Sequence, residues 1–401
     1  MMNIRAIPEL GLCSGCGACT IICQNNAIYL KESVELNFPI VEKTSCIGCK
    51  KCLEICPGYD KYNRIIRNRS LDEYHISQKT YKSKYVIAYA MDNELRKQSA
   101  SGGYITALLE VLIDKGIIDG AITLKQDLNN PLEYKSQIIR DIKSVKQTRG
   151  SRYYPASACV GLKELAHING KFAFIGKPCE VQASRYLIRN SAKYKDKLPI
   201  LISLFCHHTP TREGTFDILE RFGIELEQIA SIRYRGNGWP GMFQVIGKDK
   251  RILLMKQYRE IWDKYLSRSM PLVCKLCSDP FGKYSDISVG DAWGFKDDSE
   301  LGLSAVILRT SYGLGVHNIS IQNKKISSVD SNEYDILRGQ KPLLEKINGI
   351  DIIRDAYLLN YCANLDKIRK CIYIAQNEPR KLVKVLMASR ALKKLLKTHK
   401  R

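Results

Sequence analysis

Hydrophobic and polar positions alternate differently in the two main parts of this chain. Up to about residue 60, short apolar runs are broken by Gly, Cys and polar residues, and the runs 27–30 and 39–41 predict two short strands. From residue 85 onward, strand-like runs alternate with longer runs of helical spacing. The expected elements are a strand at 85–90, a tight turn at 101–103, an amphipathic helix at 104–115 and a strand at 121–124.

A second unit of the same kind follows. It runs from Ser157 through a helix near His167 to a strand at 172–175, a loop at 176–179 and a helix toward Arg189. A further strand at 200–205 ends at Cys206. Strands that alternate with helices indicate an α/β domain.

The pattern therefore predicts a small N-terminal module, for which the cysteine spacing within residues 13–56 indicates an α+β ferredoxin-like fold, followed by a larger α/β domain and a C-terminal helical extension. The expected boundaries are 1–60 for the module, 61–83 for a polar and basic linker, 84–348 for the large domain and 349–401 for the extension.

The bulk composition fits a folded protein of more than one domain, because the 401 residues are 45% hydrophobic. The longest apolar stretches, such as 104–112 and 200–205, fall well short of the roughly 20 residues that a membrane span needs. The N-terminus lacks a basic region followed by an apolar one, so no secretory signal is predicted. We expect a cytoplasmic protein.

The formal net charge of +22 raises the question of nucleic-acid binding. Residues 379–401 alone hold nine Lys or Arg and no Asp or Glu. No nucleic-acid motif or interleaved aromatic series accompanies this charge, so a nucleic-acid partner is not expected.

Cysteines carry the strongest chemical signal. Residues 13–23 and 46–56 both have the spacing C-x2-C-x2-C-x3-C, which is typical of proteins that hold two 4Fe-4S clusters. Zinc is the alternative, but four-cysteine zinc sites use paired C-x2-C knuckles and leave the third cysteine of each run without a role. In two-cluster ferredoxins the fourth cysteine of each run binds the other cluster. The predicted ligand sets are Cys13, Cys16, Cys19 and Cys56 for one cluster, and Cys46, Cys49, Cys52 and Cys23 for the other.

Other cysteines are less clear from spacing alone. A third cluster and unrelated buried thiols fit equally well for the set Cys179, Cys206, Cys274 and Cys277. Three more cysteines lack partners at ligand spacing and are expected in the core: Cys159, Cys362 and Cys371. His207 and His208 could be ligands or proton donors, although a structural role is the simpler interpretation.

The turn at 101–103 precedes a helix and could cradle a phosphate, but an ordinary turn is the simpler interpretation. Its glycines do not match the Rossmann or P-loop spacing, so a standard nicotinamide or ATP site is not predicted.

Several short motifs together resemble one family. They occur in the family's order over about residues 80–345, and comprise Ser101-Gly-Gly, Gly176-Lys-Pro-Cys, Cys206-His, Arg235-Gly-Asn-Gly-Trp-Pro-Gly, Cys274-x-x-Cys and Asp286-Ile-Ser-Val-Gly-Asp-Ala-Trp-Gly. This series resembles the coenzyme F420 hydrogenase/dehydrogenase beta-subunit family, here fused to a two-cluster module.

The resemblance implies an oxidoreductase that binds FAD and 4Fe-4S clusters and exchanges electrons with a hydride carrier such as coenzyme F420. It favours a third cluster on Cys179, Cys206, Cys274 and Cys277, and makes the large domain a flavin-binding one. It names no catalytic residue. The flavin contacts it suggests are Ser101, Gly102, Gly103, Arg149, Gly150, Ser151, Arg152, Tyr153, Gly176, Lys177 and Pro178.

Two functions follow from these features. The first is an iron-sulfur flavoprotein oxidoreductase, with an electron donor or acceptor protein or a coenzyme as its partner. The second is a non-catalytic electron-transfer or assembly subunit of a larger complex, which could belong to polysaccharide synthesis.

The C-terminus predicts an amphipathic basic helix. Its apolar stripe comprises Leu382, Val383, Leu386, Met387, Leu392, Leu395 and Leu396. The favoured interpretation is that this stripe packs on its own domain, and the alternatives are contact with an anionic membrane surface or with an acidic partner.

Overall fold

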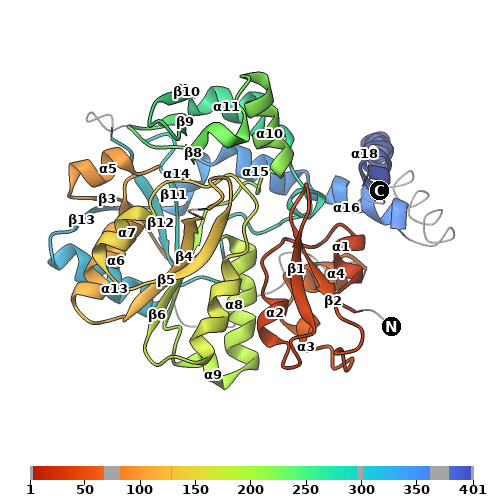
Figure 1. The fold of residues 1–401 in the computed structure, drawn as a ribbon, viewed down its shortest axis with the longest axis horizontal. Helices are drawn as coiled ribbons and strands as arrows, with labels where there is room; N and C mark the ends of the chain where they lie inside the picture. The colour runs from red at the N-terminus through yellow and green to blue at the C-terminus, as the bar shows by residue number, and fades with distance from the viewer. Residues whose placement is uncertain (1–2, 67–81, 128, 296–300, 362–378, 399–401) are drawn as a thin grey trace.

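The computed structural model describes residues 3–66, 82–127, 129–295, 301–361 and 379–398. Its centre is an eight-stranded sheet in the order β13-β3-β12-β11-β7-β6-β4-β5 (Figure 1). The strands are β3 Lys84–Ala90, β4 Gly120–Gln126, β5 Tyr134–Ile139, β6 Phe172–Gly176, β7 Ile200–Leu204, β11 Ile287–Asp291, β12 Ser304–Leu308 and β13 Ile326–Ser331.

The direction of the strands sets the functional edge of this sheet. β4, β6, β7 and β11 pair in parallel, and β12 lies antiparallel between β11 and β3, so β3 runs in the same direction as β11. The carboxyl ends of these five strands consequently meet at one edge, which is where open α/β sheets bind their ligands.

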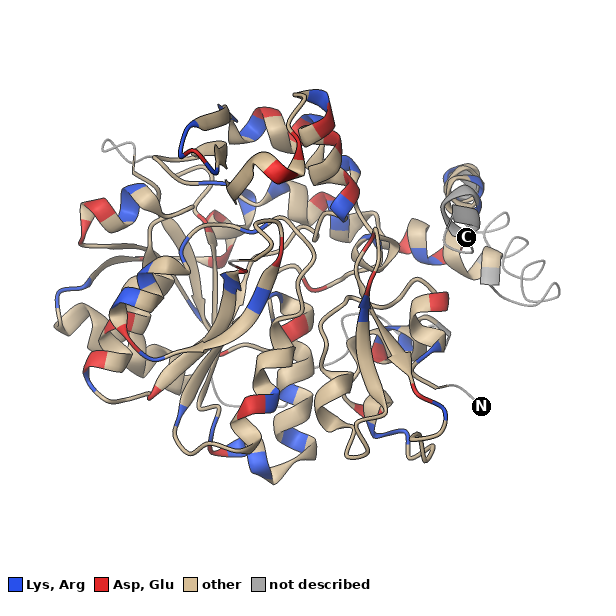
Figure 2. Ribbon diagram, viewed as in Figure 1, with Lys and Arg blue, Asp and Glu red and all other residues tan. Residues whose placement is uncertain are grey.

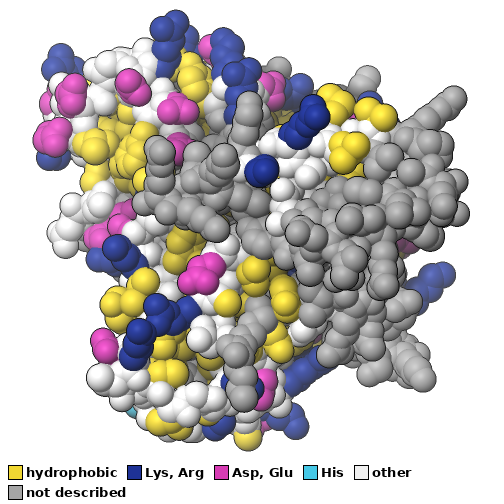
Figure 3. Space-filling view, turned by 90° about the vertical axis from the view of Figure 1, so that its right-hand side faces the viewer, with side chains coloured by type: hydrophobic (Ala, Val, Ile, Leu, Met, Phe, Trp, Pro, Cys, Tyr) yellow, Lys and Arg dark blue, Asp and Glu magenta, His cyan; other side chains and the backbone are white. Residues whose placement is uncertain are grey.

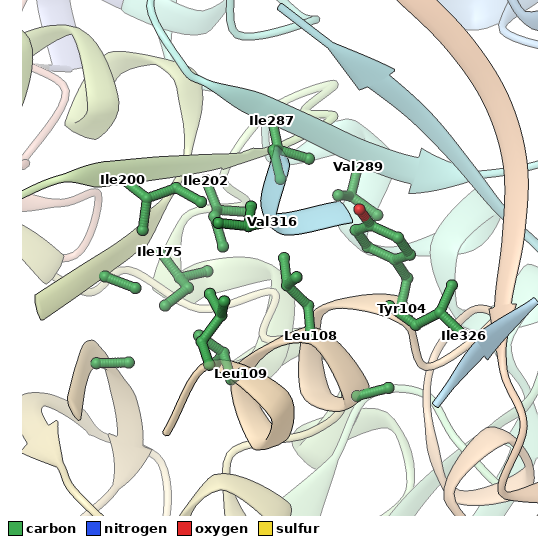
Figure 4. Packing of buried hydrophobic residues seen from close by; sticks show 14 of the residues in the cluster. Tyr104, Leu108, Leu109, Ile175, Ile200, Ile202, Ile287, Val289, Val316 and Ile326 are labelled. Carbon is green, nitrogen blue, oxygen red and sulfur yellow. The ribbon is translucent and has the colours of Figure 1, made fainter. Parts of the chain in front are cut away.

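Side chains of alternate strand residues divide the core into two layers. Ala173 and Ile175 face one hydrophobic cluster, whereas Phe172 and Phe174 face the other. The first layer (Figure 4) lies under the helices α6 Tyr104–Asp114, α7 Ile142–Gln147 and α13 Ser311–Gln322. The second layer lies under the 3-10 helix η1 Ala158–Ala166 and the helix α8 Pro178–Asn190.

Most elements expected from the sequence are present within a residue or two. The strands predicted at 85–90, 121–124, 172–175 and 200–205 and the helix predicted at 104–115 are confirmed. The amphipathic character expected for the helix is wrong, because nearly every side chain from Tyr104 to Leu112 is buried between the sheet and the neighbouring helices. The helix expected near His167 is a 3-10 helix that ends at Ala166.

The N-terminal module pairs two strands in antiparallel fashion, at nearly the positions that the sequence predicts. Its elements are α1 Ala6–Glu9, α2 Cys19–Ile22, β1 Ile28–Glu32, β2 Asn37–Val41, α3 Lys51–Glu54 and α4 Pro57–Ile66. α4 extends into residues 61–66, where the sequence pattern suggested a linker, and residues 67–81 lie outside the described residues.

A smaller three-stranded sheet of strand order β10-β9-β8 packs beside the large one around Tyr234 and Phe243. Its strands are β8 Ile229–Arg233, β9 Met242–Gly247 and β10 Ile252–Gln257. The remaining elements of this region and of the sheet edges are α5 Asn93–Gln98, α9 Ala192–Lys195, α10 Arg212–Arg221, η2 Leu226–Gln228, α11 Tyr258–Lys264, η3 Leu266–Arg268, α12 Leu272–Lys275, α14 Glu333–Arg338 and α15 Lys341–Asn348.

The C-terminal helices α16 Ile350–Tyr361 and α18 Pro379–Thr398 pack on each other and on the module (Figure 1). Tyr357 and Val385 share one hydrophobic cluster with Ile7 and Leu12, and the Tyr357 hydroxyl donates to the Leu10 carbonyl at 3.1 Å. The helical extension is therefore part of the module's core. Cys362 and Cys371 lie outside the described residues.

The module is fastened to the large domain by direct hydrogen bonds. The Ser157 hydroxyl donates to the Gly15 carbonyl at 2.6 Å, and the Cys159 amide donates to the Cys16 carbonyl at 3.2 Å. Gly17 has a positive φ, and a Cβ there would stand 2.7 Å from a methyl group of Val160. Only glycine permits so close an approach of the two parts.

No helix among the described residues is both long enough and apolar enough to cross a membrane.

Arg212 gives a test of how firmly the module is held. Its guanidinium donates to the Ser33 carbonyl at 2.6 Å and to the Asn37 amide oxygen at 2.7 Å, and it pairs with Glu133 at 3.3 Å. Arg212→Met leaves Glu133 half-buried and unpaired, so the free energy of unfolding should fall by about 3 kcal/mol. Limited proteolysis of the anaerobic protein should then cleave the module faster.

The control for this variant is Arg251→Met. Arg251 pairs with Asp249 at 2.6 Å, but both side chains are exposed, so the melting temperature should hardly change. Equal effects of the two substitutions would show that Arg212 does not hold the module.

Stability should also depend on His317 as the pH falls. Burial lowers the pKa of His317 to about 4, against an ordinary value near 6.5, and its Nδ1 lies 2.9 Å from the Tyr104 hydroxyl. The unfolded chain takes up this proton first, so stability should fall as the pH drops below about 6.5.

Between about pH 7.5 and pH 5.5, His317→Gln should remove about 1 kcal/mol of that pH dependence in urea denaturation. The exposed His167 serves as the control, since His167→Gln should leave the pH dependence unchanged. A wild-type pH profile that His317→Gln does not flatten would contradict the assignment.

Candidate functional site

The structure gathers the module's cysteines into two groups. Group one comprises Cys13, Cys16, Cys19 and Cys56, which line one cavity of about 20 Å³. Burial and the neighbouring Cys16 charge raise the pKa of the Cys56 thiol to about 12. Cys56 belongs to the second cysteine run, so the cavity combines the same four residues that the spacing assigns to one cluster.

Group two comprises Cys23, Cys46, Cys49 and Cys52. Burial, and then the charges of Cys49, Cys23 and Cys46, raise the pKa of the Cys52 thiol to about 11. Cys46 and Cys49 are exposed, and Ile47 between them is 71% exposed. Group two thus lies at the protein surface, whereas group one is enclosed.

Backbone amides near these thiols stabilise the ionised, negatively charged form of the sulfur. The Ala27 amide donates to the Cys23 Sγ at 3.3 Å, and amides of Gly15 and Gly58 donate to Cys13 and Cys56 and oppose the rise of their pKa values. Gly15 has a positive φ, as do Gly17 and Gly48. Small residues at these positions let backbone amides come close to the sulfurs.

Group three comprises Cys179, Cys206, Cys274 and Cys277, which come from three separate elements at or beside the carboxyl edge. Cys179 lies in the first turn of α8 after β6, Cys206 follows β7, and the last two lie in and just after α12. Burial raises the pKa of the Cys206 thiol to about 12, and the charges of Cys274 and Cys277 act in the same direction. The structure therefore brings together four cysteines whose spacing left their relation open.

Two lysines border group three. The charges of Lys346 and Lys177 both oppose the rise in the pKa of Cys206. The Lys346 ammonium donates to the Cys206 carbonyl at 3.4 Å and to the His207 carbonyl at 2.5 Å. Ionising four thiols that are crowded this closely is favourable only beside positive charge or a bound metal centre.

Groups one and three are neighbours. The Cys16 charge raises the pKa of Cys179, and a cavity of about 50 Å³ is lined from the module by Ser14 and Gly58 and from the large domain by Cys179 and Cys277. Cys159 is fully buried beside Cys16, as expected of a core residue. The Cys159 thiol hydrogen-bonds the Cys16 sulfur and lowers the pKa of Cys16.

Among the described residues, no three His, Cys, Asp or Glu side chains converge on a point that would suit a single metal ion. Such convergence is required of a mononuclear site such as zinc, whose ligands all reach one atom. The four thiolates of a 4Fe-4S cluster bind four different iron atoms, so they stand farther apart than the ligands of a single metal ion.

A second set of side chains occupies the carboxyl edge at the end of β11. Arg235 forms a two-pronged ion pair with Asp291 at 2.7 and 2.9 Å, and the Trp239 indole donates to the same carboxylate at 2.9 Å. The rings of Trp239 and Trp293 lie 4.5 Å apart, and the Arg259 guanidinium stands 5.1 Å from the Trp293 ring. The Arg235–Asp291 contact locks the smaller sheet to the edge of the large one.

The predicted flavin segment 149–153 approaches this aromatic set. Tyr153 packs against Tyr258 and Trp262, with ring centroids 5.7 and 5.0 Å apart, and Tyr258 lies under the Arg235 guanidinium. The Arg152 Nε is buried without a hydrogen-bond partner among the described residues, and burial lowers the pKa of this guanidinium. A buried guanidinium nitrogen left without a partner fits an anionic ligand group.

The other two segments predicted to contact flavin are held in place by hydrogen bonds and close packing within the protein. The Ser101 hydroxyl donates to the Leu303 carbonyl at 2.8 Å. Gly102 and Gly103 directly precede α6, and a Cβ on Gly102 would stand 2.8 Å from the Ala88 carbonyl. In the segment Gly176, Lys177 and Pro178, the Lys177 amide donates to the Glu180 carboxylate at 2.8 Å.

His207 and His208 follow Cys206. Their Nδ1 atoms lie 2.7 Å apart, and the His208 Nε2 lies 2.9 Å from the Leu266 carbonyl. Burial lowers the pKa values of His207 and His208 to about 4 and about 3, so both are neutral at pH 7. This geometry fits the structural role that the sequence favoured.

Sequence reasoning did not select the side chains of the β11 edge as site residues. Arg235, Trp239, Asp291 and Trp293 all fall inside motifs that supported the family resemblance. The ion pair between Arg235 and Asp291 joins positions 56 residues apart, so no spacing rule could have connected them.

These features define a class: an α/β protein that carries a cysteine module of the kind that holds 4Fe-4S clusters. Residues 12–58 match a 4Fe-4S dicluster domain. Residues 85–163 and 169–333 match the N-terminal and C-terminal models of the coenzyme F420 hydrogenase/dehydrogenase beta subunit. The chain belongs to this family, as its motifs suggested.

Two curated relatives illustrate the range of the family. One of the subunits of the F420H2 dehydrogenase of Methanosarcina mazei is 26% identical over 358 residues, which cover 87% of this chain and 90% of the relative. The coenzyme F420-dependent sulfite reductase of Methanocaldococcus jannaschii is 25% identical over 333 residues, which cover 79% of this chain and 47% of the reductase.

The fold also resembles a chain of the F420-reducing NiFe hydrogenase complex of Methanosarcina barkeri. The TM-score is 0.54 at 23% identity, and the match covers 67% of this chain and 89% of that chain. This likeness supports the mixed α/β fold of the large domain.

Group three generates a prediction about iron content. If its four thiolates hold a cluster, Cys277→Ala should lower the iron of anaerobically prepared protein from about twelve to about eight atoms per chain. The remaining iron belongs to the module, whose dicluster spectrum should be unchanged. Iron and acid-labile sulfide analysis gives the measurement.

Cys159→Ala is the matched control, because Cys159 is a fully buried thiol that lies outside all three groups. Its iron content should stay at about twelve atoms. Unchanged iron in Cys277→Ala would mean that group three consists of packed thiols.

Proposed function

We propose that the chain is an iron-sulfur flavoprotein oxidoreductase that passes electrons between 4Fe-4S clusters and, through FAD, a hydride-carrying coenzyme of the F420 type or a related organic substrate. The observation that carries the proposal is the arrangement of the three cysteine groups. They lead from the exposed Cys46–Cys49 loop, through the enclosed cavity of group one, to the carboxyl edge of the sheet.

This order suggests a direction for the electron path. Group two is exposed, so a partner protein can exchange single electrons there without entering the molecule. Group one is linked to group two through Cys52, whose charge raises the pKa values of Cys19 and Cys56. Group three follows through Cys179. Each step joins neighbouring cysteine groups, which keeps each transfer short.

The residues at the β11 edge fit a planar, phosphorylated cofactor. The partly exposed rings of Trp239 and Trp293 supply surfaces for a flat ring system, and the unpartnered Arg152 Nε offers a donor for a phosphate. Bound FAD would supply the conversion between two-electron hydride transfer and single-electron transfer. The chain's own task is to hold that group, exclude water from it and keep group three close to it.

The names of the relatives support a hydride carrier of the F420 type. Three relatives, a dehydrogenase, a sulfite reductase and a hydrogenase, have F420 in their names. In this chain the coenzyme would approach the carboxyl edge, where the parallel strands end.

A second candidate is an electron-transfer or assembly subunit without turnover of its own. One observation favours it: relatives from Methanosarcina mazei and Methanococcus voltae are named as subunits of larger enzymes. A catalytic partner would then be required for any hydride reaction.

The test begins with anaerobic purification. The protein should be brown, its absorption should include flavin bands, and denaturation should release FAD that chromatography can identify. Reduced F420 or NADH should then reduce an artificial dye if the chain itself carries the reaction. Dye reduction only after a catalytic partner is added would favour the second candidate.

Arg152→Gln sharpens the cofactor prediction. We expect a loss of about tenfold in FAD affinity, because about 1.4 kcal/mol of a charge-assisted phosphate contact is removed, with iron content unchanged. Arg251→Gln, at an exposed site, should retain full FAD binding. A colourless protein with stoichiometric zinc and no acid-labile sulfide would refute the proposed function as a whole.

A further inference from the structure

The C-terminal helix α18 has two apolar faces. Its inner face includes Val385 and Leu392, which are almost fully buried in the cluster shared with the module. Its outer face carries Val383, Leu386 and Met387, which are 60%, 44% and 67% exposed. The expectation that the whole apolar stripe packs on its own domain is therefore wrong for these three side chains.

Positive charge borders the outer face. Lys384, Arg390 and Lys393 are all exposed (Figure 2 shows the charged residues on the ribbon). At 100° per residue, Lys384 lies on one side of the apolar positions and Lys393 on the other, with Arg390 among them. The sequence from 379 to 401 contains nine Lys or Arg and no Asp or Glu.

Fixed contacts hold this outer face toward solvent. The Asn360 side chain on α16 donates to the Ser389 carbonyl and hydroxyl at 3.2 and 3.1 Å. The Lys381 ammonium lies 3.5 Å from the buried Asp355 carboxylate. Figure 3 looks at the side of the molecule on which α18 lies, and hydrophobic side chains there stand beside Lys and Arg side chains.

We propose that the outer face of α18 docks the protein on an anionic lipid surface. Val383, Leu386 and Met387 enter the boundary between headgroups and acyl chains, while the flanking Lys and Arg side chains contact anionic headgroups. Lipid is the favoured occupant because the face offers only apolar atoms and cations. The outer face has no acidic side chain that could pair with a protein partner and fix its orientation. A fluid anionic lipid surface requires no fixed orientation.

The experiment uses the anaerobic full-length protein and sedimentation with vesicles. The protein should sediment with vesicles of phosphatidylcholine mixed with phosphatidylglycerol at low salt, and should stay in the supernatant with phosphatidylcholine alone. High salt should release it, because screening weakens each headgroup contact.

Two sets of variants separate the apolar and the charged contributions. Val383→Ser with Met387→Ser should abolish sedimentation. The triple variant Lys384→Gln, Arg390→Gln and Lys393→Gln should weaken vesicle binding about a hundredfold, since each cation near an anionic surface contributes about 1 kcal/mol.

The matched control is Val329→Ser with Met91→Ser, which changes the same residue types at 66% and 52% exposure in the large domain. It should bind vesicles as wild type does. All variants alter exposed side chains, so iron content and melting temperature should stay at wild-type values.

Three outcomes would overturn the proposal. Full-length protein that stays in the supernatant with anionic vesicles at low salt excludes the lipid surface. Equal losses in the control and the α18 variants would mean that vesicle binding lies elsewhere. Self-association in analytical ultracentrifugation that Val383→Ser with Met387→Ser abolishes, without any vesicle binding, would assign the face to a second copy of the chain.

Discussion

The docking of the cysteine module on the large sheet holds cysteine groups one and three beside each other, and the rest of the site depends on this contact. The Ser157 and Cys159 hydrogen bonds to the Gly15 and Cys16 carbonyls set the loop of group one directly against the large domain. Gly17 allows this approach because a larger residue would collide with Val160. A module on a free tether would lack any such constraint.

The same docking concentrates negative charge. Thiolates gathered in a small volume repel one another, and burial alone raises their pKa values, as at Cys56 and Cys206. The chain opposes this with Lys177 and Lys346 beside group three and with backbone amides in the module. A formal charge of +22 counts every cysteine as neutral, so each bound cluster, at about −2 with its thiolates, would reduce it.

Local patterns could predict the parallel strands and the grouping of the module's cysteines because both depend on short spacings. The runs at 172–175 and 200–205 are continuous and apolar, as strands buried on both faces must be. The antiparallel strands β12 and β13 depend on pairing with β3, which lies far earlier in the chain, and no single run specifies such a pairing. The same holds for Cys179 and Cys277, which meet only because β6 and α12 reach the same edge. For α18, periodicity identified the apolar positions, but the contact with α16 decided which of them are buried.

The carboxyl edge carries two different sets of side chains, and the topology separates them along the sheet. Loops after β6 and β7 supply Cys179 and Cys206, so the thiolate group lies toward the module. The end of β11 supplies Asp291, whose ion pair with Arg235 anchors the smaller sheet and its aromatic side chains. Because β7 and β11 are adjacent in the sheet, the two sets are neighbours while resting on different supports. Elements of the large domain therefore hold group three beside the module, while the smaller sheet independently positions the aromatic side chains Tyr258 and Trp262.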